Sequence, residues 1–345
     1  MVAEQVAPER VLEVRDLVAH FPRPESGVLR RRPGAVHAVC GVSFDLARAE
    51  TLGLVGESGC GKSTTAKAVL QLCAVTSGQV RLLGEELTTK SRRQMRPHRR
   101  DLQMVFQDPF GSLDPRLPVG EIVAEPLRIH RPAGVDRRQR VAELLELVGL
   151  GPEHAGRYPH EFSGGQRQRI GIARALALEP RVLVLDEPVS ALDVSIRAGV
   201  VNLLEGLQQR LGVAYLFIAH DLSVVRHIAD RVAVMYLGKI VETGSRDDVY
   251  RRPAHPYTQA LLSAVPLADP KAERRRARIV LGGRRAQPGG PALGVPLPDP
   301  LLEGTGGVRR GGAGPGRPGP GPPGGVPLRR GRRAGRLTHL TSGGG

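Results

Sequence analysis

Residues 56–64 read GESGCGKST and fit the pattern G-x-x-x-x-G-K-[ST]. The apolar run 51–55 before them predicts a buried strand, and the apolar spacing over 65–72 predicts a helix after them. A glycine-rich loop between a strand and a helix turns backbone N–H groups inward, and the helix N-terminus adds to the attraction for an anion. The stretch therefore predicts a polyphosphate site in which Lys62 reaches the β- and γ-phosphates and Ser63 ligates Mg²⁺. The alternative, a glycine-rich turn with a surface lysine, is disfavoured by the flanking strand and helix.

Three further runs predict buried strands that end on polar side chains, where α/β sheets place ligand-binding groups. They are 102–106 before Gln107, 182–185 before Asp186 and Glu187, and 214–219 before His220. Asp186 is expected to hold the Mg²⁺ shell and Glu187 to polarise an attacking water, the alternative being an acid pair that caps a helix. A lone histidine is more often structural, but beside these residues we expect His220 to contact the γ-phosphate.

A second helix start that suits an anion begins at Ser163, an N-cap residue followed by two glycines that expose the first backbone N–H groups. That helix is predicted to run to Ala177, and by itself it is no more than a well-capped helix. Apolar spacing over 121–129 and 138–147 predicts the helices of an inserted subdomain at about residues 110–165.

The start of the chain predicts two strands, 11–14 and 36–44, joined by a Pro- and Arg-rich loop from residue 21 to 34. Phe21 lies at the start of this loop, where its ring could stack on a base. Taken alone, such a phenylalanine is more often a core residue.

Composition and charge exclude several classes of protein. No stretch approaches the roughly 18 apolar residues of a membrane span, and residues 1–15 lack a signal-peptide core, so we expect a cytoplasmic chain. The three cysteines have no paired spacing, which indicates neither a disulfide framework nor a zinc site. Of the net charge of +16, a surplus of 12 falls after residue 270, and the basic runs before it lack interleaved aromatic residues. Nucleic acid is therefore not an expected partner.

Taken together and in this order, these motifs resemble those of the nucleotide-binding subunit of an ABC transporter, over residues 11 to about 280. The resemblance implies an α/β fold, a P-loop NTPase of ABC type with a RecA-like core, an antiparallel β subdomain and the inserted helical subdomain. It assigns ATP contacts to the Walker A residues, the signature residues, the D-loop and an adenine-stacking ring: Gly56, Glu57, Ser58, Gly59, Cys60, Gly61, Lys62, Ser63, Thr64, Ser163, Gly164, Gly165, Gln166, Asp193 and Phe21. It assigns Glu187, His220 and the Q-loop residue Gln107 to catalysis, and Ser63, Gln107 and Asp186 to Mg²⁺.

Three segments, 107–115, 158–162 and 255–261, are similar to the ATPases of dipeptide and oligopeptide importers, in particular the second ATPase of the heterodimeric pair. Ala49 departs from the usual glycine, at a turn. The resemblance implies an ATPase on the cytoplasmic face of the cell membrane, bound peripherally through two permease subunits that work with an extracytoplasmic peptide-binding protein. It also implies a head-to-tail dimer with a second ABC ATPase, so that hydrolysis needs a partner chain.

Other functions stay open at this point. The same motor could serve a related substrate such as nickel or glutathione. A soluble ABC-type ATPase acting on nucleic acid or ribosomes is a second alternative, although such proteins usually carry two nucleotide domains or a coiled coil, and no heptad run is present here. An ATP-binding module without turnover is a third, and Glu187 and His220 argue against it.

Residues 271–345 differ in character from the nucleotide-binding domain at 1–270. They are rich in Gly, Pro and Arg, hold 15 basic and 3 acidic residues, and predict a disordered tail. The resembled family instead has a cysteine-containing segment here, and codons read one base further on can restore it. We therefore hypothesise a frameshift from about residue 281, to be checked on the DNA; the alternative is a genuine basic tail that binds anionic lipid or nucleic acid.

Overall fold

The computed structural model describes residues 9–22, 35–108, 111–265 and 279, all of which belong to one compact unit within residues 1–292. The predictions for the tail, its disorder and its frameshift, lie outside the described residues apart from Ile279.

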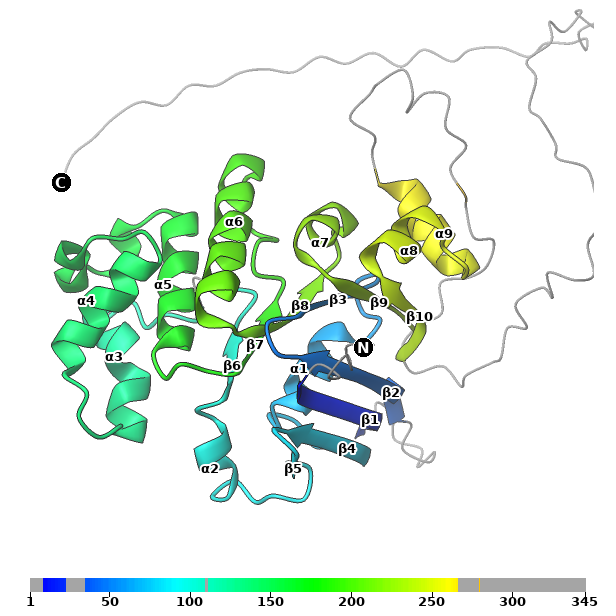
Figure 1. Ribbon diagram of the computed structural model, residues 1–345, viewed down its shortest axis with the longest axis horizontal. Coiled ribbons are helices and arrows are strands. Elements are labelled where there is room, and N and C mark those ends of the chain that lie inside the picture. The colour runs from blue at the N-terminus through cyan, green and yellow to red at the C-terminus, as the bar shows by residue number, and fades with distance from the viewer. Residues whose placement is uncertain (1–8, 23–34, 109–110, 266–278, 280–345) are drawn as a thin grey trace, which may run out of the picture. The chain divides into compact units, whose positions relative to one another are not determined.

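A six-stranded sheet forms the centre of this unit, in the order β10-β9-β3-β8-β7-β6 (Figure 1). The strands are β3 Thr51–Val55, β6 Leu102–Val105, β7 Val182–Asp186, β8 Ala214–Ala219, β9 Arg231–Tyr236 and β10 Lys239–Ser245. All neighbours pair in parallel except β10, which is antiparallel to β9. Every residue of β3, β7 and β8 is buried, which explains why these strands read as unbroken apolar runs. The strand at 102–106 is confirmed but ends one residue early, at Val105.

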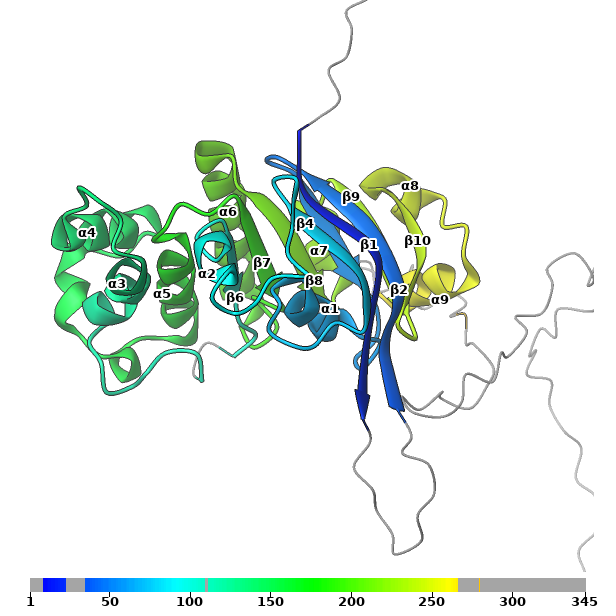
Figure 2. The ribbon, with the colours of Figure 1, turned by 90° about the horizontal axis from the view of Figure 1, so that it is seen from below.

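A four-stranded antiparallel sheet, in the order β2-β1-β4-β5, forms the second layer (Figure 2). Its strands are β1 Arg10–Pro22, β2 Ala35–Ala47, β4 Ser77–Leu82 and β5 Glu85–Glu86. Pairing between β1 and β2 runs from Arg10 and Ala47 to Pro22 and Ala35. The ladder therefore carries β1 well past the predicted end at Val14, and Phe21 lies in this strand rather than in the predicted loop.

The helices occupy three places. α1 Lys62–Val69 contacts β1 and β2 on one side and β7 on the other, between the two sheets (Figure 2). α6 Val194–Leu211, α7 Leu222–Ile228, α8 Arg246–Arg251 and α9 Pro256–Ala264 follow the later strands. α3 Val119–His130, α4 Arg137–Leu147 and α5 Gly164–Leu176 pack on one another at one end of the unit (Figure 1). The 3₁₀ turns Pro152–Gly156 and Pro159–Glu161 lie between α4 and α5 in the chain, and the short α2 Met95–His98 lies between β5 and β6.

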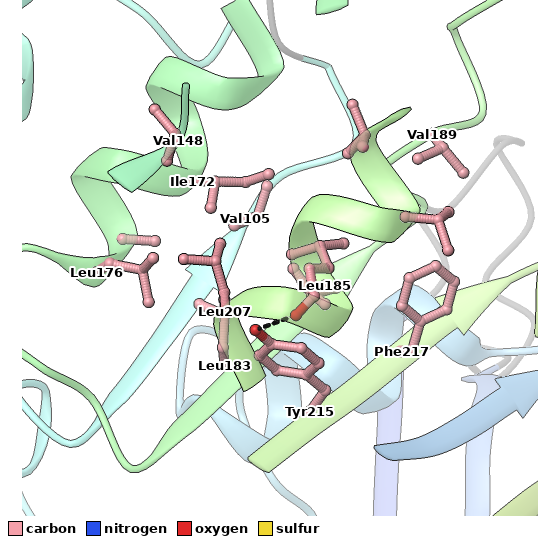
Figure 3. Packing of buried hydrophobic residues seen from close by; sticks show 14 of the residues in the cluster. Val105, Val148, Ile172, Leu176, Leu183, Leu185, Val189, Leu207, Tyr215 and Phe217 are labelled. Atoms are coloured by element: carbon pink, nitrogen blue, oxygen red, sulfur yellow. Dashed lines mark hydrogen bonds between the residues drawn. The ribbon is translucent and has the colours of Figure 1, made fainter. Parts of the chain in front are cut away.

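Two hydrophobic cores lie on opposite faces of the six-stranded sheet. Because side chains alternate along a strand, Tyr215 and Phe217 of β8 pack toward α5 and α6 (Figure 3), whereas Leu216 and Ile218 belong to the core that contains α1 and the antiparallel sheet. The buried Tyr215 hydroxyl donates a hydrogen bond to the Leu204 carbonyl oxygen at 3.0 Å. Within the described part of the chain, no helix combines the length and the apolar character needed to cross a bilayer.

Candidate active site

The phosphate loop, residues 56–64, lies between β3 and α1 with no room for side chains at two glycines. A Cβ on Gly56 would lie 2.2 Å from the Met235 carbonyl oxygen, and one on Gly61 would lie 2.2 Å from the Ala38 carbonyl oxygen. Gly61 also has φ +112° as the N-cap of α1. β9 and β2 thus hold the loop from outside, and only glycine fits at these points.

Lys62 is 4% exposed, and the loop's own carbonyl groups hold its ammonium. Its Nζ donates to the carbonyl oxygens of Gly56 at 2.7 Å and Glu57 at 2.9 Å. α1 begins at this lysine, three residues before the predicted start, and has no acidic residue in its first turn. Loop and helix start together present positive charge and glycine backbone, which is the chemistry of a polyphosphate site.

Asp186, at the end of β7, accepts a hydrogen bond from the Ser63 hydroxyl, with 2.9 Å between Oγ and Oδ1. Asp186 is 4% exposed, and this burial raises the pKa of its carboxyl, an effect that the charge of Glu187 adds to and the Ser63 hydrogen bond opposes. A hydroxyl and a carboxylate at hydrogen-bonding distance are hard oxygen donors, so the pair fits Mg²⁺.

Gln107 and His220 converge on the carboxylate of Glu187. Glu187 Oε2 accepts from Gln107 Nε2 at 2.9 Å and lies 3.3 Å from His220 Nδ1. The three residues follow β6, β7 and β8, which are neighbours in the sheet, so their carboxyl ends meet at one edge. Glu187 has φ +49°, a left-handed conformation that non-glycine residues seldom adopt. The sequence pattern predicted each of these three residues at the end of a separate strand, and the structure brings their side chains together.

The segment from Ser163 to Gln166 is a reciprocal cap at the start of α5. The Ser163 hydroxyl accepts from the Gln166 N–H at 3.3 Å, and the Gln166 side-chain oxygen accepts from the Ser163 N–H at 3.0 Å. Gly165 packs on α6: a Cβ there would lie 2.3 Å from Ile196 Cγ2. Among the described residues, these partners lie on α5 and α6, and the structure does not join the segment to the phosphate loop of the same chain.

Asp193 is exposed at the N-cap of α6 and makes no side-chain capping bond. One turn later Arg197, which the sequence did not single out, donates to Asp221 Oδ2 at 2.8 Å and to the Leu192 carbonyl oxygen at 3.3 Å. Burial opposes ionisation of Asp221, but hydrogen bonds from Ser223 and the Arg197 charge bring the pKa of its carboxyl below the usual value. Arg197 thus ties the segment before Asp193 to the residue after His220.

Phe21 is half-buried near the end of β1, opposite Val36, and is a member of neither described core. The core position expected for an isolated phenylalanine is therefore wrong.

Tyr257 of α9 is a site residue that the sequence reading missed. Its hydroxyl accepts a hydrogen bond from the Glu57 N–H of the phosphate loop at 3.0 Å, and its ring lies 4.3 Å from that of Tyr236, between centroids. Burial raises the pKa of Tyr257, so it keeps its hydroxyl proton at neutral pH. The only signal in the sequence was its place in the segment 255–261, which pointed to a resemblance and not to a role.

Comparison with known families matches two parts of the chain. Residues 39–190 match the ABC transporter family, and residues 241–289 match the C-terminal region of oligopeptide/dipeptide transporters. The second match includes Tyr257.

Curated relatives and solved structures agree with these matches. The oligopeptide transport ATP-binding proteins AppF and OppF of Bacillus subtilis are 53% and 55% identical, over 83% and 78% of this chain and 87% of each relative. The glutathione import ATP-binding protein GsiA of Shigella flexneri is 58% identical over 79% of this chain, which spans 44% of GsiA. The ATP-binding cassette MJ0796, solved as a dimer in a post-hydrolysis state with ADP and Pi, is 26% identical with a TM-score of 0.60, over 68% of this chain and 98% of that one.

These matches confirm the fold class and the resemblance found in the sequence. Because AppF and OppF exceed 50% identity over 87% of their own length, the chain belongs to the ABC transporter family, as an ATP-binding protein of the oligopeptide/dipeptide type.

Proposed function

We propose that this chain binds and hydrolyses ATP with Mg²⁺ and thereby drives uptake of dipeptides and oligopeptides through a membrane permease. The observation that carries the proposal is the convergence of Gln107 and His220 on Glu187, beside the Ser63–Asp186 pair. A carboxylate that is 13% exposed and oriented from two sides suits a group that polarises a water for attack on a γ-phosphate.

The residues near the phosphate loop then have separate roles in binding ATP and Mg²⁺. Lys62 exchanges the carbonyl oxygens of Gly56 and Glu57 for phosphate oxygens, and the backbone N–H groups of residues 58–64 cradle the chain of phosphates. Ser63, Asp186 and the Gln107 side-chain oxygen would hold Mg²⁺, which when bound neutralises charge on the phosphates. Phe21 stacks on the adenine ring.

The residues from Ser163 to Gln166, with Asp193, act on ATP bound by a second ABC ATPase subunit. In support, the partners of this segment lie on α5 and α6 of its own chain. α5 begins with two glycines, and a helix N-terminus favours an anion. Hydrolysis therefore requires a closed heterodimer, in which ATP holds the subunits together and turnover releases them. Two permease subunits and an extracytoplasmic peptide-binding protein complete the importer, and the chain lies at the cytoplasmic face of the membrane.

Glutathione, itself a small peptide, is the second candidate substrate, because GsiA shares 58% identity with this chain. The test is ATP hydrolysis in proteoliposomes by the full complex of this chain with a second ABC ATPase, two permease subunits and a peptide-binding protein. We expect dipeptides, tripeptides and longer peptides to stimulate hydrolysis more than glutathione does. Stimulation by glutathione alone would reassign the substrate, and a complex that responds to no peptide would contradict the proposal.

A further inference from the structure

His20, His37 and Cys40 bring three metal-binding side chains together on the antiparallel sheet. The register of β1 and β2 sets His20 opposite His37, and Cys40 opposite Val18. The two rings meet edge to face, with their planes at 67°, and 3.0 Å separates His20 Nε2 from His37 Nδ1. The ligand atoms of His20, His37 and Cys40 all lie within 4.8 Å of one another. We propose that these three residues form a Zn²⁺ site.

The donor set and its spacing fit this ion. Zn²⁺ is borderline soft and takes imidazole nitrogen at about 2.0–2.1 Å and thiolate sulfur at about 2.3 Å, so tetrahedral donors are separated by about 3.3–3.6 Å. The two histidine nitrogens are 3.0 Å apart and all three ligand atoms lie within 4.8 Å, so binding requires the side chains to adjust to this spacing. A water can complete the fourth position. No carboxylate belongs to the cluster, so it is distinct in chemistry from the oxygen donors at Ser63 and Asp186.

Zn²⁺ binds imidazole in its neutral form and cysteine as a thiolate, so the Cys40 proton passes to solvent when the ion binds.

Two backbone hydrogen bonds join this cluster to the phosphate loop. The Cys40 N–H donates to the Gly238 carbonyl oxygen at 2.8 Å, and the Gly238 N–H donates to the Cys60 carbonyl oxygen at 2.9 Å. The metal would pin the ends of β1 and β2, next to Phe21, against the loop. The cysteine spacing in the sequence gave no zinc signal because the ligands meet across two strands.

The test is titration of the full chain, purified without a polyhistidine tag and free of nucleotide, with Co²⁺ as a spectroscopic substitute for Zn²⁺. The chain has three cysteines, so a thiolate-to-cobalt charge-transfer band has three possible sources. We expect one equivalent of Co²⁺ to produce this band and Zn²⁺ to abolish it. Cys40→Ser should remove the band, and His20→Ala or His37→Ala should weaken Co²⁺ binding at least about tenfold.

Cys73→Ser is the matched control, since Cys73 is also half-buried and lies outside the cluster, and it should leave the band unchanged. Circular dichroism on each variant establishes that it is folded, and Zn²⁺ should raise the Tm of the wild type but not of Cys40→Ser. Absence of a thiolate band in the wild type, or its persistence in folded Cys40→Ser, would overturn the proposal.

Discussion

The Tyr257 hydroxyl accepts a hydrogen bond from the backbone N–H of Glu57 at 3.0 Å, and so joins α9 to the phosphate loop across 200 positions of sequence. The loop is held on its other sides by the Met235 and Ala38 carbonyl groups. Residues 241–289, which match the C-terminal region of oligopeptide/dipeptide transporters, thus help to fix the shape of the phosphate loop.

Tyr257→Phe tests this contact, because it removes the hydroxyl and keeps the ring beside Tyr236. A single hydrogen bond contributes about 0.5–1.5 kcal/mol, so we expect ATP affinity, measured by calorimetry, to fall about two- to tenfold. Tyr215→Phe is the matched control: it also removes a 3.0 Å phenol hydrogen bond, but one in the core, to Leu204. It should lower Tm and leave the affinity unchanged. Equal affinities for wild type and Tyr257→Phe would show that the contact does not shape the loop.

His220→Ala tests the orientation of Glu187. Loss of one of its two partners should lower kcat of the assembled complex about 100-fold while ATP still binds. His227→Ala is the control, because His227 also lies near a carboxylate, that of Glu205 at 3.8 Å, on α6 and α7 away from the strand ends. Equal loss of activity in both variants would point to a general effect of removing a histidine.

Asp186→Asn should separate stability from function. Because folding raises the pKa of Asp186 above its unfolded value, the protonated form of its carboxyl stabilises the fold. This contribution is complete below the unfolded pKa and is lost as pH rises through the folded pKa. At neutral pH the ionised carboxylate therefore destabilises the metal-free fold. The asparagine side chain is neutral and its oxygen can still accept the hydrogen bond from the Ser63 hydroxyl, so it removes this destabilisation. We expect Tm without Mg²⁺ to rise by about 2 °C or more at pH 7, and ATP hydrolysis to be lost. A lower Tm at pH 7 would contradict this sign.

Gly165→Ala tests the packing of the α5 start on α6. Its Cβ would meet Ile196 Cγ2 at 2.3 Å, so the helix start must shift. We expect hydrolysis by the assembled complex to fall at least about tenfold, with ATP binding by this chain intact. Gly171→Ala in the same helix is the control, because nothing lies within 4 Å of the added Cβ and alanine favours a helix by about 0.5–1 kcal/mol. Wild-type hydrolysis by Gly165→Ala would refute the role given to this packing.

The local sequence pattern predicted which residues follow the strand ends of this site. It could not predict which distant segments pair. Gln107, Asp186, Glu187 and His220 were predicted because each follows an apolar run, a signal carried by a few neighbouring residues. The convergence of Gln107 and His220 on the carboxylate of Glu187 depends on strand order, which a local sequence pattern does not contain. The roles of Tyr257 and Arg197 depend on partners 200 and 24 positions away, and the length of β1 depends on its pairing with β2.

Glu187 is the residue on which ATP turnover in the proposed peptide importer depends. The most direct measurement is peptide-stimulated ATP hydrolysis by the reconstituted complex carrying Glu187→Gln, with Glu179→Gln, a surface carboxylate paired with Arg140, as the control. We predict that Glu187→Gln retains ATP binding and loses turnover, while the control hydrolyses ATP at the wild-type rate. Undiminished hydrolysis by Glu187→Gln would contradict the role assigned to this residue.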